Sequence, residues 1–173
     1  QKIFAHFHTI KEGVGVHKSP QVYGAFPTDP YSHTPFGKGA QQPGMTGQVK
    51  EDIISRFGEL GIRVSNGQLS FHPSLLRKEE FLKKAKEVTV INIKGQAIKM
   101  LLPENSILFT LCQVPVLYLL SEKQGLLIKY NDGVVKEITE PSLIIEDTEK
   151  LYNRTSAIEN ITVYINTANL LVR

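Results

Sequence analysis

The first 47 residues carry four of the five histidines, and their acidic residues are Glu12 and Asp29. Paired carboxyl groups can serve as the acid and as the base or nucleophile of a bond-cleaving reaction. Glu12 and Asp29 are therefore the catalytic candidates of this segment. Asp29 lies between Thr28 and Pro30, however, where an aspartate often only starts a turn, and Glu12 could equally be an exposed residue.

The histidines of this segment suit proton transfer, hydrogen bonding or zinc binding. His6 and His8 alternate, so in a strand they would share one face, but no metal-ligand spacing supplies a third ligand and we expect no metal site. A cupin-like metal enzyme is disfavoured, since the later β-rich region has no His-x-His with a nearby glutamate. His17 and His33 lie in Gly- and Pro-rich loops. His33 could hydrogen-bond a sugar hydroxyl or a phosphate, with a buried hydrogen-bonding role as the alternative.

Aromatic and amide side chains are interspersed along the same segment. Sugars are usually held by aromatic rings together with polar groups that fix their orientation, and the segment offers this mixture in Tyr23, Phe26, Tyr31, Phe36, Lys38, Gln41 and Gln42. We expect Tyr31 and Gln42 to contact substrate; the alternative is that the rings pack the loop against the rest of the chain. Thr46 and Gly47 stand where a helix should begin, and its free backbone N–H groups could bind an anion.

These candidates lie in a segment without predicted regular structure, followed by one clear helix. Residues 1–47 hold seven of the 13 glycines and five of the nine prolines, which exclude a continuous helix. Their aromatic content and low charge are not typical of disorder. A helix is then predicted over 47–60, with Thr46 as its N-cap and Gly61 as its C′ residue. Its apolar residues recur every three or four positions, on one face: Val49, Ile53, Phe57 and Leu60.

A mainly β region follows the helix. Asn66-Gly67 and Asn131-Asp132-Gly133 are hairpin turn signals. A brief helix or charged connection is expected within 74–86. Strands are predicted at 87–94, 97–102, 106–120 (which Pro115 could divide), 125–130, 134–138, 142–147 and 158–165. Val114, Val116 and Tyr118 are expected in the core. The pattern predicts an antiparallel, jelly-roll-like β-sandwich over 62–173, preceded over 1–61 by the loop arm and one amphipathic helix.

Composition narrows the classes of protein that the chain could belong to. The 173 residues have a net charge of +3 and a mean hydropathy of −0.13. No basic cluster interleaved with aromatics indicates a nucleic-acid partner, and no apolar run is long enough for a transmembrane helix. No signal peptide opens the chain, and the compartment (cytoplasm, periplasm or outside) stays open. The single cysteine, Cys112, excludes an intrachain disulfide, and its apolar neighbours predict a buried strand position. No nucleotide-binding motif is present, and no cofactor is expected.

Three stretches of the first half of the chain resemble active-site loops of carbohydrate enzymes with an (α/α)6 barrel. They are Lys-Glu-Gly-Val-Gly-Val-His at 11–17, the Tyr-Gly-Ala-Phe-Pro-Thr-Asp-Pro-Tyr-Ser-His-Thr-Pro stretch at 23–35, and 39–51 with its Gln-Gln-Pro-Gly-Met-Thr-Gly. The chain is similar here to the cellobiose and maltose phosphorylases and to glucoamylase-like glycoside hydrolases. In the phosphorylases a β-sandwich follows the barrel, an order that this chain shares.

The resemblance implies that 1–61 is the last piece of a barrel and 62–173 the appended sandwich. It implies phosphate contacts at His17 and at Thr46 with Gly47, and a main catalytic carboxylate outside this chain. The implied partners are carbohydrate, phosphate, and the remainder of a longer chain or a second copy. Hydrolysis and phosphorolysis stay equally open. The alternative function is a non-catalytic β-sandwich module for carbohydrate binding or oligomerisation.

Overall fold

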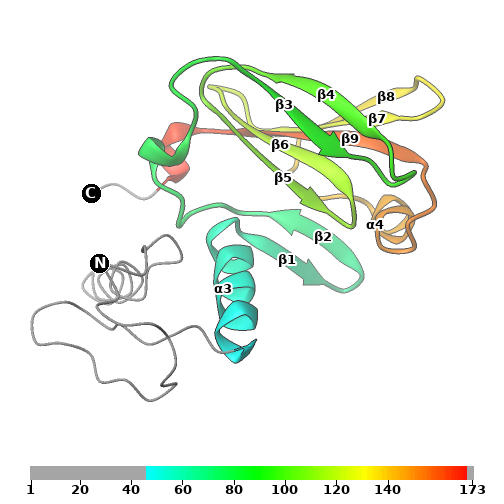
Figure 1. The fold of residues 1–173 in the computed structure, drawn as a ribbon, viewed down its shortest axis with the longest axis horizontal. Helices are drawn as coiled ribbons and strands as arrows, with labels where there is room; N and C mark the ends of the chain where they lie inside the picture. The colour runs from blue at the N-terminus through cyan, green and yellow to red at the C-terminus, as the bar shows by residue number, and fades with distance from the viewer. Residues whose placement is uncertain (1–45, 171–173) are drawn as a thin grey trace, which may run out of the picture. The chain divides into compact units, whose positions relative to one another are not determined.

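Residues 46–170 are described by the computed structural model, with side chains in the first helix described from Ile53 onward. The chain divides into two units, Gln1–Ser55 and Arg56–Arg173. The second unit is mainly β, sandwich-like, with one amphipathic helix before it, as predicted (Figure 1). None of the helices in 46–170 is long and apolar enough to cross a membrane.

Helix α3 spans Thr46–Glu59, within one residue of the predicted bounds. It ends because Gly61 adopts a left-handed conformation with φ of +67°, the conformation that a C′ glycine provides at little cost. A Cβ atom on Gly61 would lie 2.0 Å from the backbone oxygen of His72. The chain can therefore turn from helix to strand at this close approach only with glycine.

Nine strands form three sheets in the described part of the chain. The strands of the two hairpins are β1 (Ile62–Ser65) with β2 (Gln68–Phe71), and β3 (Lys86–Ile91) with β4 (Ala97–Leu102). A five-stranded sheet has the order β5-β6-β9-β7-β8 and contains β5 (Ser106–Leu111), β6 (Val114–Leu120), β7 (Gly125–Tyr130), β8 (Val135–Ile138) and β9 (Ile158–Ile165). A 3-10 turn at Lys78–Glu80 occupies the predicted charged connection.

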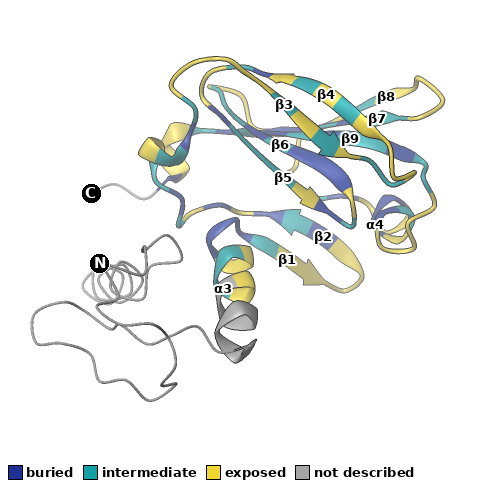
Figure 2. Cartoon of the chain, in the orientation of Figure 1, coloured by how far each residue is buried: buried dark blue, intermediate teal, exposed yellow. Residues whose placement is uncertain are grey.

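The core lies against one face of the five-stranded sheet. Val116 pairs with Ile161, and Tyr118 pairs with Val163, in the β6–β9 register, and all four side chains are at most 1% exposed. The predicted core positions Val114, Val116 and Tyr118 are thus confirmed, and β6 is the most continuously buried strand (Figure 2). Residues from outside the sheet complete the same apolar cluster: Leu60, Leu69, Phe71, Leu76, Phe81, Leu143, Leu151 and Leu170.

Two predictions about the sheet are wrong in detail. The sheet is mixed rather than antiparallel, since β6 and β9 run parallel. Only the first part of the predicted strand 142–147 pairs, through a bridge between Ser70 and Ser142. Helix α4 (Ile145–Tyr152) begins directly after it. Glu146 and Asp147 lie in its first turn, where the helix dipole favours acidic side chains.

The predicted strand 106–120 divides at Cys112 and Gln113 rather than at Pro115. Both turn residues have positive φ, 50° and 68°, as in the two-residue turns whose twist matches a hairpin. Cys112 is therefore a partly buried turn residue that packs against the core, and not a buried strand residue. Pro115 fits inside β6 because the pairing of β6 with β9 begins only at Val116, so no donor is required from the proline there.

We expect Gly61→Ala to lower the free energy of unfolding by more than about 2 kcal/mol, because alanine combines left-handed strain with a backbone clash. Gly58→Ala is the matched control: Gly58 lies in α3, and a Cβ there meets no atom within 4 Å. That control should gain about 0.5–1 kcal/mol. Urea denaturation measures both values, and equal stability of the two variants would contradict the role assigned to Gly61.

Candidate functional site

Six of the predicted site residues lie outside the described part of the chain: Glu12, Asp29, His17, Tyr31, His33 and Gln42. Thr46 and Gly47 are the first two residues of α3. The structure thus places this pair at a helix start, as the sequence indicated, and the first turn of the helix contains no acidic residue. The structure does not test the roles predicted for any of these residues.

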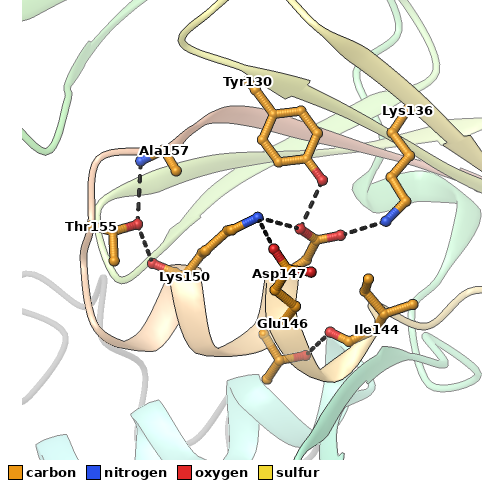
Figure 3. Close-up of polar contacts among 9 residues, drawn as sticks. Tyr130, Lys136, Ile144, Glu146, Asp147, Lys150, Thr155 and Ala157 are labelled. Carbon is orange, nitrogen blue, oxygen red and sulfur yellow. Dashed lines mark hydrogen bonds and ion pairs between the residues drawn. The ribbon is translucent and has the colours of Figure 1, made fainter.

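The buried carboxylate of Asp147 contacts donor groups from the sheet and from its own helix. Its side chain is 2% exposed. The Tyr130 hydroxyl at the end of β7 donates a hydrogen bond of 2.8 Å to Oδ1, and Lys136 Nζ on β8 donates one of 2.9 Å to Oδ2 (Figure 3). Lys150 Nζ lies 3.7 Å from Oδ1 and 2.6 Å from Glu146 Oε1. These contacts attach α4 to the β7–β8 edge of the sheet.

The electrostatics of this cluster oppose proton transfer. Burial by itself would raise the pKa of Asp147, but the hydrogen bonds from Lys136 and Tyr130 and the charges of Lys136 and Lys150 outweigh it, and the pKa is lowered. Burial and the hydrogen bond to Asp147 raise the pKa of Tyr130. The carboxylate therefore stays ionised and the phenol stays protonated near neutral pH. A general acid needs a pKa near the working pH, and neither Asp147 nor Tyr130 meets this condition.

A second charged cluster holds the C-terminal end of α3. Arg56 Nη1 lies 2.6 Å from Glu59 Oε2 and 2.8 Å from Glu80 Oε2. Glu80 also accepts a hydrogen bond of 2.9 Å from the backbone N–H of Arg77. Next to this cluster, the hydroxyl of Tyr118 donates a hydrogen bond of 2.6 Å to the carbonyl oxygen of Leu60. The last turn of α3 is thus attached both to the 3-10 turn at 78–80 and to β6.

Two pockets in the β unit are large enough to consider as binding sites. One, of about 230 Å³, lies where the β3–β4 and β5–β6 turns approach Asn131 and Glu159. The other, of about 340 Å³, lies beyond the end of β2 and is lined by His72, Gln124 and Tyr164 among others. Within residues 53–170 no three His, Cys, Asp or Glu side chains are placed to hold a metal ion.

Sequence reasoning missed both the Asp147 cluster and the larger pocket. Glu146 and Lys150 are four residues apart, a spacing that forms ion pairs on a helix. This pair could have been predicted from the sequence if a helix had been assigned there. Tyr130, Lys136 and Asp147 are brought together only by tertiary structure, and no short-range pattern connects them. Comparison of the chain with protein-family models and with curated proteins found no match.

We expect Asp147→Asn to lower the free energy of unfolding by about 1–3 kcal/mol, the cost of losing charged hydrogen bonds. Lys136 and Lys150 are 36% and 33% exposed, so water can hydrate them and limit the loss. Glu87→Gln, which breaks the exposed pair with Lys99, should change stability by no more than about 0.5 kcal/mol. Denaturant titration compares the two, and a similar loss in both would contradict the structural role of Asp147.

The same carboxylate predicts a pH dependence of stability. The pKa of Asp147 in the folded protein is below its ordinary value of 3.8. The ionised side chain therefore adds to the free energy of unfolding at pH values above 3.8, and this contribution is lost as the pH falls through the folded pKa. The stability gap between the wild type and Asp147→Asn should therefore be full near neutral pH and narrow below about pH 4. Thermal unfolding at stepped pH measures the gap, and a constant gap would be the contrary result.

Proposed function

We propose that the chain is the C-terminal part of a carbohydrate-active enzyme, a glycoside hydrolase or a disaccharide phosphorylase. In this proposal the β unit supports the last helix of a catalytic helical barrel. Residues 1–47 contribute sugar and phosphate contacts. The observation that carries the proposal is helix α3, which follows the barrel-like sequence stretches and leaves apolar side chains exposed.

The exposed face of α3 supports a helical neighbour. Ile53, Ile54 and Phe57 are 53%, 70% and 38% exposed. The sequence pattern placed Ile53 and Phe57 on one helix face together with Leu60, and of these three only Leu60 is buried, at 5% exposed. Apolar helix faces are stable when they pack against another element. In a helical barrel, the adjacent helix would cover this apolar face.

The attachment of α3 to the β unit supports the bracing role. Leu60 is part of the apolar core, its carbonyl oxygen accepts the Tyr118 hydrogen bond, and Arg56 binds Glu80. These contacts fix the last turn of the helix to groups far away in the sequence. A β unit that only followed a barrel as a tethered module would not need such a buried attachment at the helix end.

The chemistry of the β unit supports assigning catalysis elsewhere. One of its buried carboxylates, Asp147, is kept ionised by lysine and tyrosine donors. In the proposed enzyme the acid is then Glu12, Asp29 or a carboxylate outside the 173 residues. In the alternative function, a non-catalytic carbohydrate-binding module, the pocket at Tyr164 would be the relevant feature.

The test uses the natural protein that contains these residues, assayed on cellobiose and maltose with and without inorganic phosphate. Asp29→Ala should lower turnover by about 100-fold or more if Asp29 transfers a proton. His33→Ala should weaken substrate binding by about tenfold, as expected for loss of a polar contact. Glu104→Ala, an exposed acid in the β unit, is the control and should leave turnover unchanged.

The outcomes separate the two functions and the two reactions. Release of a sugar phosphate only when phosphate is present indicates phosphorolysis, and His17→Ala should then raise the KM for phosphate. Equal turnover in the wild type, Asp29→Ala and His33→Ala removes both residues from the site. No turnover of either disaccharide, with saccharide binding retained, favours the non-catalytic module.

A further inference from the structure

The β3–β4 hairpin adds no side chain to the core of the β unit. Each of the other strands has a residue in the apolar core cluster or packed against it, whereas none of residues 86–102 belongs to that cluster. Among these residues only Leu102, at the base of the hairpin, is buried. Burial of apolar surface is the main force that holds most elements in place, so this force is weak for the hairpin.

The hydrogen bonds of the hairpin are internal. β3 and β4 pair along their whole length, from Lys86 with Leu102 to Ile91 with Ala97, and neither pairs with a further strand in the described part of the chain. Lys99 Nζ likewise donates its hydrogen bond of 2.9 Å to Glu87 Oε1 within the hairpin. Within residues 46–170, no hydrogen bond or ion pair joins 86–102 to the rest of the unit.

One face of the hairpin is nevertheless turned toward the five-stranded sheet. Cross-strand partners share a face, and the row formed by Val88 with Met100 and Val90 with Ile98 is half-buried, while the opposite row is exposed. Ile98 of the half-buried row lines a cavity of about 230 Å³ together with Pro115 of β6. The inner face of the hairpin therefore approaches β6.

The side of β6 that faces the hairpin carries a second, smaller apolar layer. Leu117 alternates with the core residues Val116 and Tyr118, so it lies on the same side of the strand as Pro115. Its partner on β5 is Leu108. Both leucines are half-buried and neither belongs to the core cluster. Moving the hairpin away would expose this layer and leave the core packed.

We propose that the β3–β4 hairpin is a flap that opens as one unit while the five-stranded sheet stays folded. Opening uncovers the 230 Å³ cavity and the layer of Leu108 and Leu117. It requires no hydrogen bond to the sheet to be broken, and it removes only the contacts of the half-buried row. Once open, a two-stranded hairpin is marginally stable in water, so its backbone amides become free to exchange with solvent.

The test is native-state hydrogen exchange of the isotopically labelled 173-residue chain, followed by NMR. The amides bonded across β3 and β4 should share one opening equilibrium and exchange about 100-fold or more faster than those of β6 and β9, after correction for intrinsic rates. Low concentrations of urea should accelerate β6 and β9 steeply and the hairpin only slightly, because opening the flap exposes little surface. This comparison is made within the wild-type protein.

A core variant separates opening of the flap from unfolding of the whole unit. Ile161 of β9 is 0% exposed, and Ile161→Val should accelerate exchange in β6 and β9 about two- to tenfold. The hairpin amides should keep their wild-type rates, because the variant destabilises the closed and the open forms equally. Ile145→Val, the same change at a residue that is 50% exposed, is the matched control and should alter neither group.

Four results would overturn the flap. Three of them are equal protection in the hairpin and in β9, equal dependence on urea, and equal acceleration of both by Ile161→Val. Each would mean that the hairpin exchanges only when the whole unit unfolds. The fourth is fast exchange with unrelated rates along β3 and β4, which would show that the strands fray residue by residue.

Discussion

The architecture depends on the contact between Gly61 and the backbone of His72 and Pro73. Because a Cβ at position 61 would lie 2.0 Å from the His72 oxygen, the chain can leave helix α3 and enter β1 there only through glycine. The turn carries Leu60 into the apolar core, with its carbonyl oxygen 2.6 Å from the Tyr118 hydroxyl. Tyr118 in turn packs edge-on against Phe71 and Phe109, so one backbone approach connects the helix end to the centre of the core.

Two charged clusters of the β unit attach helices to neighbouring elements. Asp147 joins α4 to Tyr130 and Lys136, and Arg56 joins α3 to Glu80. Burying a carboxylate is costly unless donors and cations compensate for the lost water. Here the compensation is sufficient to lower the pKa of Asp147 below its ordinary value. A carboxylate that is kept ionised in this way is poorly suited to act as a general acid near neutral pH.

Local signals in the sequence predicted the parts of the fold that are formed by local interactions. The Asn66-Gly67 turn, the helix between Thr46 and Gly61, and the β7 and β9 bounds follow from turn residues and periodicity. The parallel pairing of β6 with β9 joins segments about 45 residues apart in the sequence and has no short-range signature. Helix α4 was not predicted, because the apolar run Leu143, Ile144 and Ile145 favours a strand. The helix is instead stabilised by tertiary contacts of Asp147 and Leu151. The pocket lined by His72, Gln124 and Tyr164 is formed by segments that are far apart in the sequence. No local sequence pattern could therefore predict it.

Charge is distributed unevenly along the chain. Residues 1–50 contain five lysines and two acidic residues, whereas residues 51–173 contain 15 basic and 15 acidic residues. In the proposed enzyme, phosphate would bind where positive charge and helix N–H groups occur together, and the sequence up to Thr46 and Gly47 is the candidate for this role. The β unit instead combines paired charges with an uncharged pocket. A pocket without charged lining residues offers no countercharge to an ionised ligand, so burying a charge there would be costly.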